Sequence, residues 1–447
     1  MTRVLMFGWD LPPLSGGGVG TACLGLTRAL AQLGADVTLV VPHPPGDLGI
    51  PRVRVAAAPQ LDLSIPPRAA PAPPAPHAAV ACQPESPQAT AGHLRIRAIE
   101  SPLSPYLTQE TYTEVVAPPP VTQSTAATAS GGAPVLPELH ARLGTDLFTE
   151  VFRYGKAAES LAAQEPFDII HAHDWMTIPA ALATSLATGR PYVLHIHSLE
   201  TDRAGSRPDP TIFEIEKLGM ACASHVVAVS DYTRQIILRR YGIAPDRVSV
   251  VHNAVSRTDA GSVYHVRRRQ RQRTVLFLGR ITAQKGPDYF VEAAALVAAA
   301  VPDTHFVMAG SGDMLPRIVE RVAELRLGGR FTFTGALHGA DVERMYAASD
   351  LYVMPSVSEP FGLAPLEAML YDVPVIISRQ SGVAEVLHHA LTVDFWDVAG
   401  LAAKIIAVLK YPVLARELVR NSREELKGLR WESAAAKVLS IYRRLTG

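Results

Sequence analysis

The stretch Glu359-Pro-Phe-Gly-Leu-Ala-Pro-Leu-Glu367 follows the apolar run Leu351-Tyr-Val-Met-Pro-Ser-Val357. The run is typical of a buried strand, and the stretch is typical of a tight loop that leads into a helix. Pro365 suits the first helical position, where its missing N–H costs nothing, and Glu367 then falls in the first turn. In open α/β sheets, ligands bind where parallel strands end, and a helix N-terminus there favours an anionic group. The stretch therefore predicts a ligand site with two glutamates at the carboxyl edge of a parallel sheet.

Short apolar strands and amphipathic helices alternate on both sides of this stretch, which predicts an α/β protein built on doubly wound parallel sheets. Because 447 residues are too many for one ordinary core, we expect two Rossmann-like domains in tandem. The first spans residues 1–255 and the second spans 274–430. A polar linker at 256–273 separates them, and a terminal helix at 431–447 can cross back to the first domain.

Two stretches of biased composition interrupt the first domain. Residues 63–92 are rich in Pro and Ala, and residues 122–137 are rich in Thr, Ala, Ser and Gly, so neither is expected to hold regular structure. They predict an insertion near 60–140. The linker carries a basic cluster, Arg267-Arg-Arg269 with Arg271. No aromatic residues interleave with these arginines, so we interpret them as a solvated segment rather than a nucleic-acid site.

The composition argues against partners that are recognised through overall charge. Lys plus Arg and Asp plus Glu number 42 each, so no net charge attracts nucleic acid or an anionic membrane. The longest apolar run, 293–301, is about half the length needed to span a bilayer. The three scattered cysteines (Cys23, Cys82 and Cys222) fit a reducing compartment, and the chain opens on a strand-like segment rather than a leader. We therefore expect a soluble, cytoplasmic protein without a transmembrane segment.

A glycine loop, Gly16-Gly-Gly-Val-Gly20, follows the first strand-like segment. A dinucleotide-binding fingerprint would place an acidic residue at the end of the second strand, but that strand ends in Val41-Pro-His43. NAD is therefore disfavoured. The loop permits close approach of the backbone to a sugar or phosphate, and a tight turn without a ligand stays open as an alternative.

Two cations lie at the end of one strand and the start of the next helix. Gly279-Arg280 ends the strand, and Lys285-Gly286 opens the helix. Two fixed cations near a helix N-terminus suit a diphosphate. Simple solvation of the two side chains is the alternative.

Histidines gather at the ends of two further strands. His171, His173 and Asp174 end one strand, and His195 and His197 end the next. Zinc is the obvious alternative, but the i,i+2 spacing on a strand places a pair on one face rather than in a tetrahedral cage. Packing and helix capping account for His171 and Asp174, so His173 is the candidate site residue and no metal is expected.

Taken together, these motifs resemble the retaining nucleotide-sugar glycosyltransferases of family 4, which have the two-Rossmann-domain (GT-B) architecture. The strongest element of the resemblance is a glutamate, seven residues and a second glutamate, Glu359 to Glu367. The amino-acid sequence at residues 197–203 and 378–383 is most similar to that of the prokaryotic glycogen-synthase-like branch. The supporting motifs occur in the family's order over nearly the whole chain outside 60–140: Gly17-Gly-Val-Gly20, His171-Ala-His-Asp174, Ser230, His252-Asn253, Gly279-Arg280, Lys285-Gly286, Gly310-Ser-Gly312 and Gly382-Val-Ala-Glu385.

The resemblance implies a division of roles. Arg280 and Lys285 hold the donor diphosphate, Glu359 contacts the donor sugar, and His173 binds that sugar near its 6-hydroxyl. Glu367 accepts the ribose hydroxyls, since a carboxylate accepts two O–H groups at once. The rest of the donor-binding set is Gly17, Gly18, Gly310, Gly312, Phe361, Gly362 and Leu363. On the acceptor side, we expect His197, Asp202 and Arg203.

The implied reaction is transfer of a hexose, glucose by preference, from a nucleoside diphosphate sugar to a glycan or another sugar acceptor. It proceeds on the front side of the sugar with retention, and no cofactor or metal is required because cations and helix amides neutralise the leaving diphosphate. Glycogen-type synthases generally carry a lysine in the first glycine loop, but no lysine precedes Lys156 here. The nucleotide therefore stays open among ADP, UDP and GDP.

Two other functions fit part of the pattern. A nucleotide-sugar epimerase shares the two-domain architecture, although the Glu359-to-Glu367 spacing with Arg280 and Lys285 is not expected of it. A protein that binds a sugar nucleotide without turning it over is the third possibility. Product analysis separates the three, because transfer releases the nucleotide, epimerisation keeps it attached, and binding changes nothing.

Overall fold

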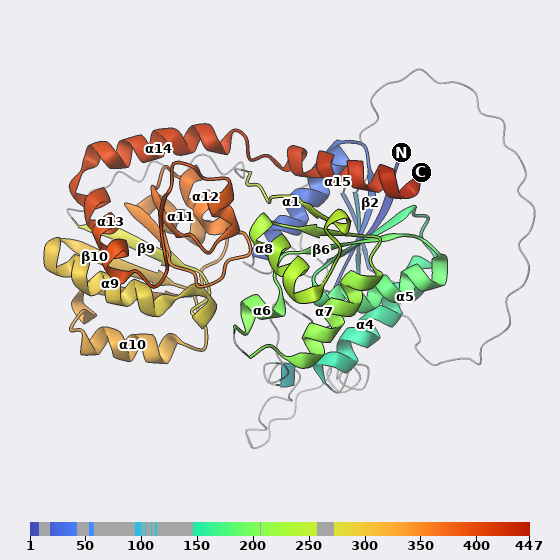
Figure 1. The fold of residues 1–447 in the computed structure, drawn as a ribbon, viewed down its shortest axis with the longest axis horizontal. Helices are drawn as coiled ribbons and strands as arrows, with labels where there is room; N and C mark the ends of the chain where they lie inside the picture. The colour runs from blue at the N-terminus through green and yellow to red at the C-terminus, as the bar shows by residue number, and fades with distance from the viewer. Residues whose placement is uncertain are drawn as a thin grey trace, which may run out of the picture.

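The computed structural model describes residues 1–8, 18–42, 53–57, 94–99, 101, 103, 109, 112–113, 146–205, 207–256 and 272–447. Most of the predicted insertion near 60–140 and of the predicted linker at 256–273 lies outside these residues. So do Gly17, Cys82 and the arginines at 267–269 and 271. The described residues form two parallel α/β units that lie side by side (Figure 1).

The first unit is built on an eight-stranded parallel sheet with the order β3-β4-β2-β1-β5-β6-β7-β8. Its strands are β1 (Arg3–Phe7), β2 (Asp36–Val41), β3 (Val53–Ala57), β4 (Leu94–Ala98), β5 (Ile169–His173), β6 (Tyr192–Ile196), β7 (His225–Ala228) and β8 (Val248–Val250). Central strands such as β1 are buried on both faces, which is why they are continuous apolar runs.

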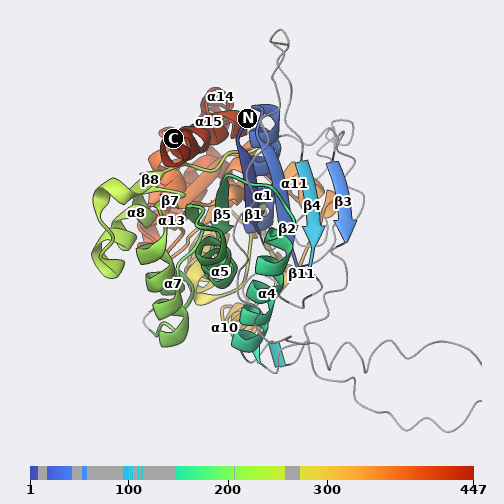
Figure 2. The ribbon, with the colours of Figure 1, turned by 90° about the vertical axis from the view of Figure 1, so that its right-hand side faces the viewer.

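Helices cover both faces of this sheet (Figures 1 and 2). Successive residues of β1 point to opposite sides, so Val4 and Met6 pack with α1 (Gly18–Gln32), whereas Leu5 and Phe7 pack with α4 (Leu147–Ala162). The second face also carries α5 (Ile178–Thr188) and α7 (Pro210–Cys222). Two short helices, α6 (Glu200–Arg203) and α8 (Asp231–Ile236), follow β6 and β7.

The second unit has a six-stranded parallel sheet with the order β11-β10-β9-β12-β13-β14. Its strands are β9 (Arg273–Leu278), β10 (Thr304–Ala309), β11 (Phe331–Gly335), β12 (Leu351–Met354), β13 (Val375–Ser378) and β14 (Leu391–Val393). Its helices are α9 (Pro287–Ala300), α10 (Leu315–Glu324), α11 (Ala340–Ala348), α12 (Leu363–Leu370), α13 (Val398–Lys410) and α14 (Pro412–Leu426). The predicted class of two doubly wound parallel sheets is thus confirmed.

The terminal helix α15 (Trp431–Thr446) returns to the first unit and packs on α1 (Figure 1). The indole of Trp431 lies directly over Gly25, where an added Cβ would approach it to 2.2 Å. Further along α15, the Tyr442 hydroxyl lies 2.6 Å from Nδ1 of His171. The two chain ends therefore come together, as both ribbon views show (Figures 1 and 2). The predicted crossing back is confirmed.

Two local predictions were wrong. Helix α12 begins at Leu363 rather than at Pro365, so Pro365 is the third helical residue and Glu367 lies beyond the first turn. Strand β12 ends at Met354, which leaves 355–362 as a longer loop than expected. Strand β5 ends at His173, so His171 and His173 both lie on the strand. Strands β3 and β14, each at an edge of its sheet, were not predicted.

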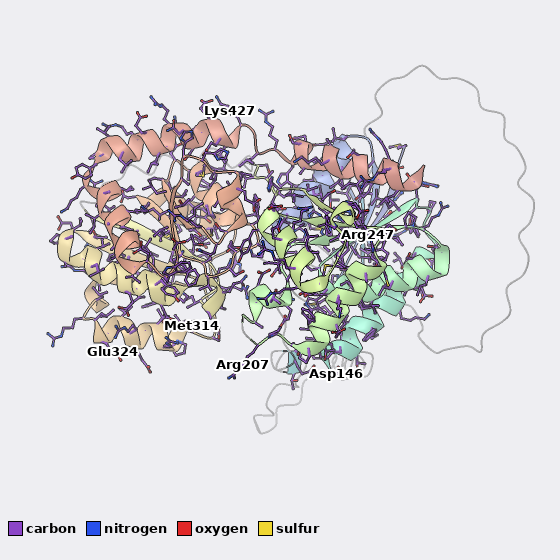
Figure 3. All side chains as sticks on the ribbon, in the orientation of Figure 1. Asp146, Arg207, Arg247, Met314, Glu324 and Lys427 are labelled. Atoms are coloured by element: carbon purple, nitrogen blue, oxygen red, sulfur yellow. The ribbon has the colours of Figure 1, made fainter. Side chains whose placement is uncertain are left out.

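In each unit, the chain order reverses at one place in the sheet: between β1 and β5, and between β9 and β12. Ligand sites of open α/β sheets form at such switch points. One apolar core joins the units, because the residues around α1 and α15 pack continuously with Phe361, Leu363 and Leu366. Charged side chains such as Glu324 and Lys427 extend outward from the second unit (Figure 3).

Across the described residues, no single helix has both the length and the apolar composition needed to cross a membrane. Helix α13 and the segment Pro412–Thr446, which are bent by 97° at their junction, pass on length and composition when taken as a pair.

Candidate functional site

A cavity lies where the two units face each other, at the carboxyl ends of β9 and β12 in the second unit and beside the starts of α1 and the β6 loop in the first. Both switch points therefore contribute to it. Its lining comprises Gly18, Val19, Thr21, His197, Asn253, Phe277, Leu278, Gly279, Arg280, Lys285, Tyr352, Val353, Met354, Ser356, Glu359, Phe361, Gly362, Leu363, Ala364 and Glu367.

Two cations line the second-unit side of the cavity. Nη2 of Arg280 donates to Oε1 of Gln284 at 2.7 Å, which fixes the direction of the guanidinium. Lys285 forms an ion pair with Glu359, and Ser356 Oγ donates to the same carboxylate at 3.3 Å. The side chain of Glu359 is 8% exposed and that of Lys285 is 23% exposed. The residue types predicted for phosphate and for sugar thus meet at one point.

The loop that carries Arg280 depends on glycines nearby. An added Cβ at Gly310 would lie 1.9 Å from the carbonyl oxygen of Gly279, and one at Gly312 would lie 2.3 Å from the carbonyl oxygen of Ile281. Gly310 also has a φ of +147°, which side chains disfavour. The lining contains neither of these glycines. They act on the site by letting the Arg280 loop approach the neighbouring strand end.

Helix α12 begins at the cavity. Its N-cap, Gly362, has a φ of +101° and no side chain to cap the helix, so the first amide groups of the helix are directed to the cavity wall that Leu363 and Ala364 form. A helix N-terminus with uncapped N–H groups favours an anion. The sequence predicted a helix N-terminus at this place, although it put the start of the helix two residues too late.

Glu367 lines the cavity one helical turn further on. Its Oε2 accepts from the Tyr346 hydroxyl at 3.0 Å. Burial raises the pKa of Glu367, and the hydrogen bond from Tyr346 opposes that rise. Because Tyr346 donates to one carboxylate oxygen, the carboxylate has a fixed orientation. Its other oxygen is left to accept a hydrogen bond from a ligand in the cavity.

Of the two histidines predicted to lie near the sugar, His197 lines the cavity and His173 lies behind it. His173 is fully buried, and its Nδ1 lies 2.8 Å from Nε2 of His197. Burial lowers the pKa of His197 to about 3, so the ring facing the cavity is neutral. The structure therefore places His173 one side chain away from the cavity rather than in its wall.

Asp174 holds the backbone that carries His197. Its Oδ1 accepts from the backbone N–H groups of His197 and Ser198 at 2.6 and 3.2 Å. The backbone of Asp174 has φ +57° and ψ −179°, a region that residues other than glycine rarely occupy. Burial raises the pKa of Asp174 to about 6, against the charge of Arg203 and the two amide bonds. Strain of this kind persists where the surrounding structure fixes it.

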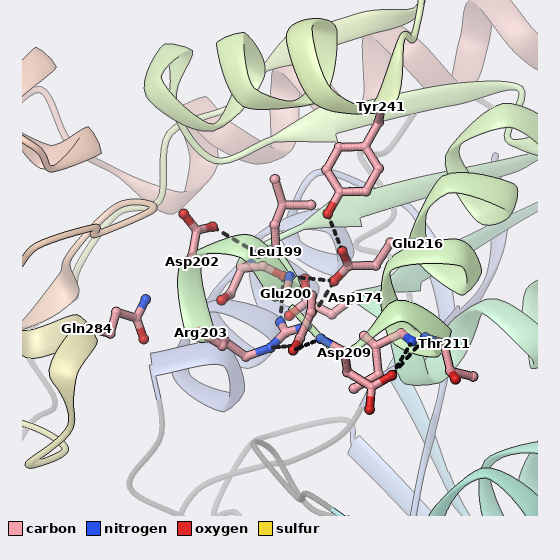
Figure 4. A network of polar contacts seen from close by, with 12 residues as sticks. Asp174, Leu199, Glu200, Asp202, Arg203, Asp209, Thr211, Glu216, Tyr241 and Gln284 are labelled. Atoms are coloured by element: carbon pink, nitrogen blue, oxygen red, sulfur yellow. Dashed lines mark hydrogen bonds and ion pairs between the residues drawn. The ribbon is translucent and has the colours of Figure 1, made fainter. Parts of the chain in front are cut away.

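The predicted acceptor-side residues Asp202 and Arg203 belong to a buried network outside the cavity lining (Figure 4). Arg203 lies 2.9 Å from Glu216 and 3.2 Å from Glu200, and its Nη1 donates to the carbonyl of Ser198 at 2.8 Å. Three buried carboxylates (Asp174, Glu200 and Glu216) share this one guanidinium as a nearby cation. Burial accordingly raises the pKa of Glu216 to about 7. In this structure Arg203 supports the segment after β6 that presents His197.

Asp202 connects the two units. Its carboxylate accepts from Ser358 Oγ at 2.6 Å and from the backbone of Leu199 at 3.0 Å. Ser358 also lies 3.1 Å from the Tyr232 hydroxyl. Because Ser358 directly precedes Glu359, these contacts from the first unit hold the loop that carries the cavity carboxylate.

A second inter-unit contact is made by Glu385. Its carboxylate accepts from the backbone N–H groups of Asp231 and Tyr232 at 2.8 and 2.6 Å and lies 3.0 Å from His252 Nε2. These bonds, together with the histidine, hold the pKa of Glu385 below its usual value although burial opposes them. Nearby, Ser230 Oγ donates to the carbonyl of Pro360 at 2.5 Å. The relative position of the units is thus fixed at the edge of the cavity.

The cavity thus brings together Gly18, His197, Arg280, Lys285, Glu359, Phe361, Gly362, Leu363 and Glu367 from the predicted set. It leaves His173, Asp202, Arg203, Gly310 and Gly312 behind its walls. The sequence missed Ser356 and Tyr346, which donate to Glu359 and Glu367 from 3 and 21 positions away in the chain but carry no signal of their own in it. Among the residues that the structure describes, His171, His173 and His195 place nitrogen atoms close enough together to hold a metal ion.

Comparison with known proteins gives the chain a family. The pattern of the "Glycosyl transferases group 1" family matches residues 265–425, and that of "Glycosyltransferase Family 4" matches residues 113–258. The alpha-maltose-1-phosphate synthase of Mycolicibacterium smegmatis is 30% identical over 315 residues, which cover 63% of this chain and 80% of that protein. The glycogen synthase of Mycobacterium tuberculosis is 26% identical over 285 residues, which cover 62% and 68%.

Solved structures show the same architecture. The sucrose-phosphate synthase of Thermosynechococcus elongatus superposes with a TM-score of 0.68 at 21% identity, covering 100% of this chain and 99% of that one. The Anabaena protein HepE, in complex with UDP-glucose, superposes with a TM-score of 0.65 at 15% identity and covers both chains completely. With two parallel-sheet units, a cavity at their switch points and these relatives, the chain belongs to the group 1 glycosyltransferases of family 4 and has the GT-B fold.

Proposed function

We propose that this glycosyltransferase is a retaining hexosyltransferase that moves a hexose, with glucose as the leading candidate, from a nucleoside diphosphate sugar to a glycan or another sugar acceptor. The observation that carries the proposal is the convergence of Arg280, Lys285 and the uncapped start of α12 on one cavity that also contains the buried Glu359 and the partly buried Glu367. Two cations and a helix N-terminus suit a diphosphate, and carboxylates suit hydroxyl groups.

The assignment of roles follows the geometry of the cavity. Arg280, Lys285 and the amides at Gly362 and Leu363 bind the diphosphate and neutralise the charge that develops as it leaves. Glu367, oriented by Tyr346, accepts the ribose hydroxyls. Glu359 accepts hydroxyls of the transferred sugar, while Lys285 changes partner from that carboxylate to the phosphate.

On the opposite wall, His197 contacts the sugar near its 6-hydroxyl, and His173 acts through the ring contact with His197. Both rings are neutral, since burial lowers the pKa of His173 well below its usual value and that of His197 to about 3. They therefore serve as hydrogen-bond partners rather than as cations. The acceptor enters from the first unit, and the leaving diphosphate itself takes the acceptor's proton.

The names of the relatives support a sugar acceptor. A glycogen synthase extends a glucan, and a maltose-1-phosphate synthase makes a disaccharide phosphate. We therefore expect glycogen or glucose 1-phosphate to serve as acceptor probes. A cytoplasmic location remains our prediction, in keeping with substrates of this kind.

A donor panel tests the proposal. UDP-, ADP- and GDP-glucose are each incubated with the protein, an acceptor probe and EDTA, and the products are followed by proton NMR. Transfer predicts free nucleoside diphosphate and a new α-glycosidic signal that keeps the configuration of the donor. If the nucleotide stays attached to an altered sugar, the protein is an epimerase. If a donor binds but no product forms with any acceptor, it is a binding protein.

A further inference from the structure

Four imidazoles form an array on one face of the first sheet. His171 and His173 are two residues apart on β5, so they share one face of the sheet. His195 on the neighbouring β6 and His197, just after it, are likewise two residues apart. His173 and His195 are direct register partners in the parallel pairing. The ring centroids of His195 and His197 are 4.5 Å apart, and those of His171 and His173 are 4.7 Å apart. The i,i+2 spacing on a single strand argued against a zinc site. Two neighbouring strands, however, place two such pairs of histidines side by side.

Three of these rings present nitrogen atoms at distances suited to a metal. Nε2 of His171 and Nδ1 of His195 are 3.3 Å apart, and the ligand nitrogens of His171, His173 and His195 all lie within 4.8 Å of one another. Zinc–imidazole bonds of about 2.0–2.1 Å in a tetrahedral arrangement place two ligand nitrogens about 3.4 Å apart. The first pair meets this distance without movement, and His173 needs a shift of about 1 Å or a little more.

The surroundings of the rings suit a neutral imidazole ligand set. The Tyr442 hydroxyl, 2.6 Å from Nδ1 of His171, can accept that N–H and so leave Nε2 as a lone pair. Metal-bound histidines commonly use their other ring nitrogen in this way. Nε2 of His195 is buried and has no hydrogen-bond partner.

We propose that His171, His173 and His195 form a binding site for a borderline divalent metal such as Zn²⁺, separate from the donor cavity. Imidazole ligands select zinc, nickel or copper rather than magnesium or calcium, which prefer oxygen. Three neutral ligands leave the double charge of the metal uncompensated in a buried place, so we expect a dissociation constant on the order of micromolar.

Metal binding at this site has a consequence for His173. Nδ1 of His173 lies 2.8 Å from His197, and a ring that turns toward a metal loses that contact. Zn²⁺ is therefore expected to disturb the wall of the cavity that His197 forms. The site acts on the enzyme as an inhibitory one, and a chelator reverses the effect.

The test measures metal binding on the full chain. Apo protein is titrated with Zn²⁺ by calorimetry, and one Zn²⁺ is expected per chain. His195→Asn removes one ligand without touching the donor cavity and is expected to weaken binding at least tenfold. His338→Asn, at an exposed histidine outside the group, is the matched control and is expected to bind as the wild type does. Mg²⁺ in place of Zn²⁺ is expected to give no heat of binding.

A second measurement uses the wild-type protein, so the proposal can be tested even if the variant does not fold. Co²⁺ added to the wild-type protein is expected to give the visible absorption of a tetrahedral nitrogen site, and Zn²⁺ is expected to abolish it by competition. The proposal is overturned if Zn²⁺ does not bind the wild type, if all variants bind it equally, or if the Co²⁺ spectrum is octahedral. None of these readouts depends on turnover, so they are independent of the proposed transferase reaction.

Discussion

Glu367 and Tyr346 form a pair in which one residue orients the other. The hydroxyl of Tyr346 donates to Oε2 of Glu367, and the carboxylate then offers its remaining acceptors to the cavity. A hydrogen bond to a charged group contributes about 1.5–3 kcal/mol, which corresponds to roughly ten- to a hundredfold in affinity. Most of the donor's ribose recognition is therefore assigned to this carboxylate.

We expect Glu367→Gln to weaken donor binding about tenfold with little change in kcat, because the amide keeps an acceptor for Tyr346 but loses the charge. Binding is measured by calorimetry with the best donor. Tyr346→Phe is the matched control, since it removes the orienting bond and leaves the carboxylate in place. Unchanged donor affinity in Glu367→Gln, or a larger loss in Tyr346→Phe than in Glu367→Gln, would contradict the assignment of the ribose to this carboxylate.

Glu216 gives a pH dependence of stability. Burial raises its pKa to about 7 in the folded protein, against 4.5 as its ordinary value, although the charge of Arg203 and the hydrogen bond from Tyr241 oppose the rise. A raised carboxyl pKa means that the folded state binds the proton more tightly. Its contribution to stability is therefore fully present below about pH 4.5 and is lost as the pH rises toward 7.

Urea unfolding between pH 4.5 and 7.5 tests this dependence. In the wild type, the contribution of Glu216 to the free energy of unfolding is expected to fall by on the order of 3 kcal/mol over that range. Glu216→Gln is expected to remove this contribution, since the amide does not titrate, so the difference between the two profiles isolates it. A variant profile that runs parallel to the wild-type profile across this window would contradict the assignment.

Single residues at strand ends were the easiest part of the site to predict. Arg280, Lys285 and Glu359 come shortly after apolar runs of strand length, and a parallel sheet brings the carboxyl ends of its strands to one edge. It could not be predicted that His197 lines the cavity while His173 lies behind it. This arrangement depends on β6 lying beside β5 and on Tyr442, which comes from the last helix. The same holds for Asp202, whose partner Ser358 lies 156 positions away.

At the scale of elements, Glu385 caps α8 across the boundary between the units. Its carboxylate accepts two backbone N–H groups at the start of that helix and contacts His252. A lost helix cap costs about 0.5–2 kcal/mol, and here the cap also fixes one unit against the other.

Glu385→Ala is therefore expected to destabilise the protein by about 1–2 kcal/mol and to raise the KM for the donor several-fold. Thermal unfolding and steady-state kinetics provide the two readouts. Glu417→Ala removes a carboxylate from an exposed ion pair within α14 and is expected to cost less than about 0.5 kcal/mol. Comparable effects in both variants would argue against a role for Glu385 between the units.

Helices α1 and α15 pack through a glycine. An added Cβ at Gly25 would lie 2.2 Å from the indole of Trp431, which has no room to move within the core. Overpacking of this kind costs about 1–3 kcal/mol. We expect Gly25→Ala to lower the stability by that amount.

The control for Gly25 is Gly328→Ala. Gly328 has no heavy atom within 4 Å of an added Cβ, so the substitution is expected to be neutral or slightly stabilising. Guanidinium unfolding of both variants measures the difference. If Gly25→Ala were as stable as Gly328→Ala, the docking of α15 on α1 would be wrong.

Element boundaries were harder to predict than element types. The start of α12 was displaced by two residues, because Pro365 is tolerated throughout the first turn. The edge strands β3 and β14 were missed, and β14 is only three residues long.

At the scale of the whole molecule, two similar sheets place their switch points opposite each other. One apolar core runs from α15 and α1 through Phe361 to α12, so the units share packing as well as polar contacts. This arrangement gives the cavity one wall of cations and glutamates and another that contains the neutral ring of His197. A ligand with an anionic part and a neutral sugar matches both walls.

The central claim is that Arg280 and Lys285, without a metal, hold the diphosphate of a nucleotide sugar during transfer. The most direct test is the rate at which nucleoside diphosphate is released in EDTA by the wild type and by Lys285→Ala, with Lys410→Ala as an exposed-lysine control. Full activity in EDTA is expected for the wild type and the control, and a loss of about a hundredfold or more is expected for Lys285→Ala. Release that requires added Mg²⁺, or that survives Lys285→Ala at the wild-type rate, would contradict it.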